Sequence, residues 1–207
     1  MGKSLITGIT ALVLLTTLML IGITVASVLT GETTGATTEE DYDQLVDETM
    51  DEISTYIMIK DQKGKFSGPI GQKKIDKIAL WITPLFTQVI DTSQLTIQID
   101  NGKTVRFLSY GQSEDLASSS LFDHPIWNQM NISNFSFISI VDLDNSLVEF
   151  DTLNDCSDNA YLVFQLPEDM ALAKYDKIKV TLFPSTGITR IIELKAPMPM
   201  KSVITFE

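Results

Sequence analysis

The chain has 207 residues and a net charge of −12 at pH 7. Binding to DNA or RNA depends on Lys and Arg side chains that neutralise phosphates, so this charge argues against a nucleic-acid partner. The single cysteine, Cys156, excludes an intramolecular disulfide.

An uncharged apolar segment, residues 4–31, opens the chain with the sequence SLITGITALVLLTTLMLIGITVASVLTG. As an α-helix it would reach roughly 40 Å, more than the hydrocarbon core of about 30 Å. A cleavable signal peptide is a weaker interpretation, because the apolar run is too long and only Lys3 precedes it. A helix that is apolar on all sides is stable only when buried, either in lipid or among identical chains. The side chains that we expect to be buried in this way are Leu5, Ile9, Leu12, Leu14, Leu15, Leu18, Leu20, Ile21, Val25 and Val28.

An acidic amphipathic segment, residues 40–58, follows the apolar one. Residues 32–52 carry nine carboxylates and no Lys or Arg. The apolar residues recur at steps of three and four, which is typical of a helix with one polar face. They are Tyr42, Leu45, Val46, Met50, Ile53, Tyr56 and Ile57. We therefore predict an N-terminal helical region over residues 1–59.

A linker is predicted over residues 60–71, KDQKGKFSGPIG, where Gly, Pro and Lys collect. From residue 72 onward the apolar pattern has a period of two, which is typical of strands. Asn101-Gly102 between two such runs is a strong hairpin signal. The strands are expected over residues 77–86, 94–100, 104–110, 134–142, 147–151, 160–166, 177–183, 188–194 and 202–206.

These elements predict an α+β chain, in which a long N-terminal hydrophobic α-helix precedes an all-β sandwich domain of immunoglobulin-like architecture, residues 72–207. The Cys…Trp…Cys signature of true immunoglobulin domains is absent, so the likeness concerns architecture alone.

Catalytic chemistry finds little support in the sequence. The only histidine, His124, lies in LFDHPIW, where a surface or packed histidine is the simpler interpretation. Nothing in the sequence orients it toward Cys156, and a blue-copper site would need a second histidine. We predict no catalytic residues and no enzymatic activity.

Residues 142–159, DLDNSLVEFDTLNDCSDN, are rich in oxygen ligands. Asp142, Asp144 and Asn145 are the candidate ligands for Ca²⁺. The stretch departs from the EF-hand template, because Leu147 stands where Gly is needed and Leu153 where Glu is needed. A solvated acidic turn without a metal is the alternative.

Two overlapping acceptor sequons occur in NISNFS, at Asn131 and Asn134. In a domain exposed outside the cell they predict N-linked glycans as the covalent modification. Two ordinary asparagines in a polar loop are the alternative.

Three stretches carry a family resemblance: ITGITALVLLTTLMLIGITVASVL, GETTGATTEE and IDKIALWITPLFTQVIDTSQLTIQI. They resemble archaeal flagellins (archaellins), although the resemblance fades in the C-terminal half. It implies a structural subunit that polymerises through its N-terminal helix into the archaellum, the extracellular swimming filament of archaea. In that family the helices bundle as the filament core and the β-domains form the outer wall.

The resemblance also implies partners. They are further copies of the chain, a paralogous archaellin in a mixed filament, the membrane before assembly through a single-pass intermediate, a prepilin-type signal peptidase, and the archaellum motor and assembly machinery. Archaellins are made with a short basic leader, whereas only MGK precedes the apolar run here. The chain is therefore either a processed form or is cut between Gly2 and Lys3, and we favour the first.

Two other classes share this plan. A bacterial-type pilin usually has a glutamate near its mature N-terminus, whereas this chain has no acid before Glu32. A membrane-anchored extracellular β-sandwich, such as a stator-like accessory or adhesion protein, remains the alternative function.

Overall fold

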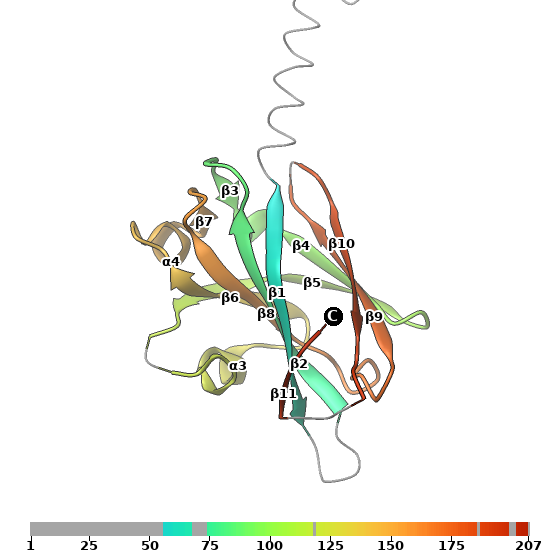
Figure 1. The fold of residues 1–207 in the computed structure, drawn as a ribbon. Coiled ribbons are helices and arrows are strands. Elements are labelled where there is room, and N and C mark those ends of the chain that lie inside the picture. The colour runs from blue at the N-terminus through green and yellow to red at the C-terminus, as the bar shows by residue number, and fades with distance from the viewer. Residues whose placement is uncertain (1–55, 68–73, 118, 186, 199–201, 207) are drawn as a thin grey trace, which may run out of the picture. The chain divides into compact units, whose positions relative to one another are not determined.

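The computed structural model describes residues 56–67, 74–117, 119–185, 187–198 and 202–206 (Figure 1). The predicted apolar helix, residues 4–31, lies outside the described residues, as does all but the end of the amphipathic segment 40–58. Among the helices of the described part, none is long and apolar enough to cross a membrane.

The described residues are mostly β-structure, as the period-two pattern predicts. The strands are β1 (Ile57–Ser67), β2 (Lys74–Pro84), β3 (Ile90–Asp91), β4 (Thr96–Asp100), β5 (Val105–Asp115), β6 (Asn134–Val141), β7 (Thr152–Leu153), β8 (Asn159–Gln165), β9 (Lys177–Phe183), β10 (Arg190–Lys195) and β11 (Val203–Thr205). The short helices are the 3₁₀ turns η1 (Thr92–Gln94) and η2 (Leu121–Asp123), and the α-helices α3 (Ile126–Gln129) and α4 (Ser146–Phe150).

Nine strands form one sheet in the order β10-β9-β4-β5-β6-β8-β2-β1-β11, and β3 pairs separately with β7. The long strand β5 belongs to both halves of this sheet. Its first residues, 105–108, pair antiparallel with β4, and residues 109–115 pair in parallel with β6, with an irregularity between Tyr110 and Ser113. The two halves therefore meet along a single strand.

One hydrophobic core lies between these halves. Ile97 on β4 and Val180 on β9 are fully buried in the same cluster as Ile78 on β2 and Leu162 on β8. A second, smaller cluster covers the other face of the β2–β8 region, where Ala79 and its neighbours pack against η2 and α3. The arrangement of strands is sandwich-like (Figure 1). The second cluster forms an additional apolar layer beneath the η2–α3 segment.

The predicted linker, residues 60–71, is wrong over most of its length. Strand β1 spans Ile57–Ser67 and pairs antiparallel with β2 from end to end. Its lysines alternate with the buried residues Gly64 and Phe66, so the polar residues that indicated a linker occupy one face of a strand. The sheet consequently begins at Ile57 rather than at residue 72, and residues 57–59, which the prediction placed in the helical region, belong to β1.

The predicted strand over residues 147–151 is also wrong, because these residues form α4. Asp142 accepts hydrogen bonds from the backbone N–H groups of Ser146 and Leu147, at 3.0 Å each. Capping of free N–H groups by a carboxylate favours the start of a helix. This local contact overrides the alternating pattern of LVEFD.

Candidate functional site

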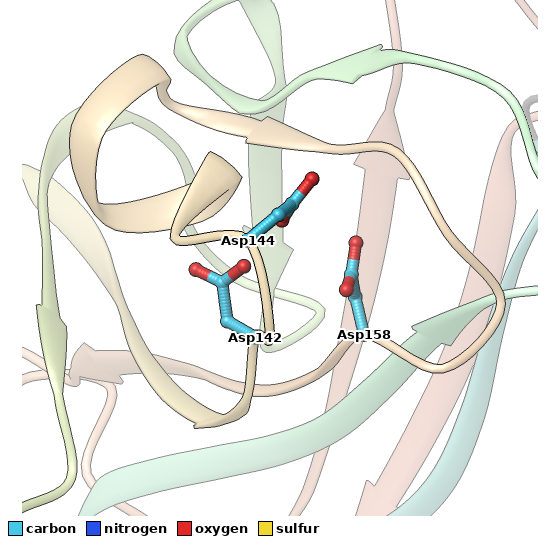
Figure 2. Close-up of side chains that lie close together, drawn as sticks. All are labelled: Asp142, Asp144 and Asp158. Atoms are coloured by element: carbon cyan, nitrogen blue, oxygen red, sulfur yellow. The ribbon is translucent and has the colours of Figure 1, made fainter.

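Three carboxylates gather at the end of the sheet that carries α4 and β7 (Figure 2). Asp142 follows β6, Asp144 precedes α4, and Asp158 directly precedes β8. One oxygen from each lies within 4.8 Å of the others. The sequence therefore identified two members of the cluster, Asp142 and Asp144.

Asp158 is the member that sequence reasoning missed. It is only 2% exposed and accepts hydrogen bonds from the backbone N–H groups of Asn154 and Asp155, at 3.0 and 2.9 Å. The turn that these bonds close returns the chain to the acidic stretch 142–144. The acidic stretch NDCSDN contains Asp158, but it lies so far along the chain from Asp142 that the sequence alone does not show that the two carboxylates are close in space.

Asn145, the third predicted ligand, lies beside the pair as the exposed N-cap residue of α4. Its backbone adopts the left-handed conformation, with φ of 59°, and its side chain makes no capping hydrogen bond. Asn154 approaches the cluster instead. Its amide nitrogen donates to Asp144 at 2.7 Å, while its Oδ1 is buried and has no hydrogen-bond partner within the part of the chain that the structure describes.

The environment separates the proton affinities of two of these carboxyls. Burial is the main cause that raises the pKa of Asp142, and the proximity of Asp144 and of the Asp158 charge adds to it. Hydrogen bonds from Asn154 and from Ser146 lower the pKa of Asp144 to about 2. Like charges held together in this way are relieved by a proton or by a cation. Oxygen ligands of this kind suit a hard cation such as Ca²⁺.

The two sequons lie between the end of α3 and the start of β6. Asn131 is exposed, and its backbone carbonyl accepts a 3.0 Å hydrogen bond from the N–H of Asn134. Asn134 is half-buried as the first residue of β6, and its amide nitrogen donates to the carbonyl of Tyr110 at 3.4 Å. The two side chains therefore differ in accessibility. A polar hollow of about 370 Å³ lies beside them, lined in part by Gln112 and Gln129.

His124 is a packed histidine, in agreement with the simpler interpretation. It is 4% exposed. Its Nε2 donates to the carbonyl of Asp115 at 2.9 Å, and its Nδ1 accepts from the N–H of Ile126 at 3.2 Å. Both ring nitrogens are thus occupied in holding the start of α3, while Cys156 is exposed on a loop.

Solved structures with a similar fold are archaeal filament proteins. The archaeal flagellin FlaB1 from Methanocaldococcus jannaschii is 20% identical, with a TM-score of 0.64 over 72% of this chain and 95% of that one. The archaeal flagellum of Methanospirillum hungatei strain JF1 is 12% identical, with a TM-score of 0.51 over 95% of this chain and 98% of that one. A comparison with curated proteins found no match.

The model of one protein family, archaeal-type flagellin, matches residues 6–194. This range includes both the apolar N-terminal segment and nearly all strands of the β-domain. The resemblance seen in the sequence is thereby confirmed, and with it a structural role in a motility filament at the cell surface, in a family that is not one of enzymes. The chain belongs to the archaeal-type flagellin family and is a structural subunit of the archaeal swimming filament.

Proposed function

We propose that this subunit polymerises through its N-terminal helix, residues 4–31, and that its β-domain, an immunoglobulin-like sandwich, forms the outer wall of the filament. The observation that carries the proposal is the family match over residues 6–194, which joins the uncharged segment and the β-domain in one architecture. The chain carries out no catalysis. Its function is mechanical.

Burial explains why one segment serves two states. Before assembly the apolar helix rests in the membrane as a single-pass intermediate, processed by a prepilin-type signal peptidase. After assembly the same surface is covered by neighbouring copies, or by copies of a paralogous archaellin, and the motor and assembly machinery turn the polymer. Head-to-tail contacts whose rotation does not close produce an open helical filament.

A carboxylate in the middle of the helix tests this role. Leu14→Asp places a charge that costs about 2.5–3.5 kcal/mol at mid-membrane, which a single-pass anchor of this hydrophobicity absorbs. In a filament the charge repeats in every subunit, within a dry core. We expect Leu14→Asp to leave the chain in the membrane fraction and to abolish filaments and swimming, whereas Leu14→Met leaves both intact.

The same experiment separates the filament subunit from a membrane-anchored accessory protein. An accessory protein stays in the membrane fraction and is absent from sheared filaments. Mass spectrometry of threads sheared from wild-type cells reads this directly. Threads that lack the chain, or a Leu14→Asp strain with normal filaments, would refute the proposal.

We propose further that Asn131 carries an N-linked glycan. Its exposed position in a turn supports accessibility for a transferase, whereas Asn134 is half-buried and hydrogen-bonded at its amide nitrogen. Asn134 is therefore the second and less occupied acceptor.

We also propose that Asp142, Asp144 and Asp158 bind Ca²⁺. The proposal is supported by the three clustered carboxylates and by the unpartnered Oδ1 of Asn154 next to them. Asn145 remains a candidate ligand at the edge of the cluster. Such an ion would stabilise the α4 end of the domain by joining β6, α4 and β8.

A further inference from the structure

The outer face of β1 and β2 carries an ordered row of cations, which we call the lysine face: Lys60, Lys63, Lys65 and Lys77. Each ammonium lies over an aromatic ring, at 5.6 Å from the Trp81 centroid, 5.3 Å from Tyr161, 6.0 Å from Phe122 and 5.0 Å from Trp127. A cation over an aromatic face is attracted by the ring quadrupole. The lysine face therefore combines four ammonium groups with aromatic rings beneath them, and one carboxylate of the same strand, Asp61, lies 3.4 Å from the Lys63 ammonium.

Two of these lysines lie directly opposite each other on neighbouring strands. Lys65 and Lys77 are cross-strand partners in the β1–β2 ladder, an arrangement that is unfavourable for like charges. Asp123 contacts Lys65 at 3.0 Å, whereas Lys77 makes no ion pair among the described residues. Burial, and then the charge of Lys65, lower the pKa of Lys77 by more than the nearby charges of Asp76 and Asp123 raise it. The pair thus has less negative charge around it than it needs.

The opposite charge collects elsewhere on the same domain. Residues 142–158, which we call the acidic end, contain six carboxylates, and residues 107–173 contain no Lys or Arg. Even with a divalent cation bound, the acidic end keeps four negative charges. It also exposes two large apolar side chains, Leu143 at 86% and Phe150 at 68%, which suit an aromatic surface.

Lys65 and Lys77 are too far from the acidic end to neutralise it within one subunit, whereas Lys60 lies beside that end, where its ammonium donates to Oδ1 of Asn159 at 2.8 Å. Thr83, which donates to the carbonyl of Asp158 at 2.7 Å, marks the acidic end on β2. Lys77 lies six residues away on the same strand, a separation of roughly 20 Å at about 3.4 Å per residue. This exceeds the Debye length of about 8 Å at physiological salt. Figure 1 shows α4 and β7 near the end at which β1 begins, and α3 toward the other end of that strand.

We propose that the lysine face of one subunit binds the acidic end of a second subunit in the filament. The proposal rests on assembly of the chain into filaments. It names a contact between β-domains in addition to the one between helices. Because the two surfaces differ, the contact is heterologous, and heterologous contacts propagate into open polymers. Charge complementarity fixes the register of such a contact and disfavours wrong ones.

Zero-length cross-linking of native filaments tests this pairing. A carbodiimide joins a lysine amine to a carboxylate only where the two touch. After treatment of sheared filaments, dimer bands are excised and their linked peptides sequenced. We expect peptides that join Lys65 or Lys77 to residues 142–158, present in the dimer and absent from unassembled membrane-held subunit. The exposed Lys177–Glu193 pair, at 2.5 Å, is the reagent control within each subunit.

Each outcome is decisive. Dimer links from the lysine face to residues 32–52 or to another acidic surface would overturn the assignment of the partner region, and an absence of such links beside the Lys177–Glu193 control would overturn the contact. Filaments that lack the chain would instead refute the filament function. The two failures are therefore distinguishable.

Charge variants supply the second test. Lys65→Gln/Lys77→Gln is expected to raise the ratio of membrane-held to filament subunit on the order of tenfold, the factor that corresponds to about 1.4 kcal/mol. Lys103→Gln/Lys179→Gln removes the same charge from exposed positions elsewhere and should have no such effect. Lys77→Glu is expected to impair assembly, and Glu149→Lys in the same chain to restore it in part. Equal ratios for the two Gln variants would contradict the proposal.

Discussion

Gly64 lies where β1 is covered by the last residues of the described chain. It pairs with Ile78 on β2 and with Ile204 on β11. A Cβ at this position would lie 2.9 Å from Cγ2 of Ile75 and 2.9 Å from the ring of Phe206. Real Cβ atoms do not approach other atoms so closely. Gly64→Ala therefore forces the Phe206 ring and β11 away from the core.

The expected cost follows from overpacking. One extra methyl group in a packed core costs about 1–3 kcal/mol, which for a domain of this size lowers the Tm by about 3–10 °C. The assay is tryptophan fluorescence during thermal unfolding of the full-length chain in detergent. Both tryptophans of the chain, Trp81 and Trp127, lie in the β-domain, so their signal reports on this domain alone.

A double-mutant cycle identifies the mechanism. Phe206→Leu removes the ring atoms nearest to the new methyl, so Gly64→Ala/Phe206→Leu should lose less stability than the sum of the two single variants. Gly102→Ala is the matched control. Nothing lies within 4 Å of its Cβ, and its φ of +80° makes the cost one of backbone strain, which Phe206→Leu does not relieve. A Gly64→Ala domain with wild-type Tm, or strict additivity with Phe206→Leu, would refute the reasoning.

Three further outcomes are expected. Ca²⁺ adds RT ln(1 + [L]/Kd) to stability when it binds only the folded state, so a chelator should lower the Tm of the wild type and leave that of Asp158→Asn unchanged; an unaffected wild type would exclude the metal site. In metal-free protein, protonation of Asp144 lowers the stability of the domain as the pH falls from about 4 to about 2, because the pKa of Asp144 is lower in the folded state than in the unfolded one. The pKa of Asp142 is shifted in the opposite direction, so protonation of Asp142 raises the stability of the domain as the pH falls toward 4. Unfolding curves of Asp144→Asn should therefore show a smaller loss of stability in acid than those of the wild type. Peptides from the native organism that cover NISNFS should carry a glycan mass, with higher occupancy at Asn131 than at Asn134; unmodified peptides would refute the glycan.

The strands that the sequence predicted correctly share a simple cause. In β4 and β9 every second residue is fully buried, as at Ile97, Ile99 and Val180, so local periodicity and tertiary burial agree. The hairpin between β4 and β5 was predictable for a similar reason, because Gly102 supplies the positive φ that the turn requires.

The errors arise where a distant contact decides the local structure. In β1, Ile75 and Phe206 lie so close to Gly64 that they leave no room for a Cβ. Nothing in the local sequence KDQKGKFS indicates these contacts, because they come from other parts of the chain. In the acidic cluster, Asp158 joins Asp142 only after the turn at Asn154 closes. Spacing along the sequence predicts two of the three carboxylates, and the position of the third depends on how β6 and β8 are paired.

Strand β1 in place of a linker also changes how load enters the β-domain. From Ile57 to Ser67 this strand is hydrogen-bonded to β2, and near its end Lys63, Gly64 and Lys65 pair with β11 as well. A pull on the chain at Ile57 therefore runs along the strand and loads many ladder hydrogen bonds together in shear, because those bonds lie across the strand direction. A flexible linker would transmit neither torque nor orientation. Strand β1 instead distributes a pull at Ile57 over its ladder with β2.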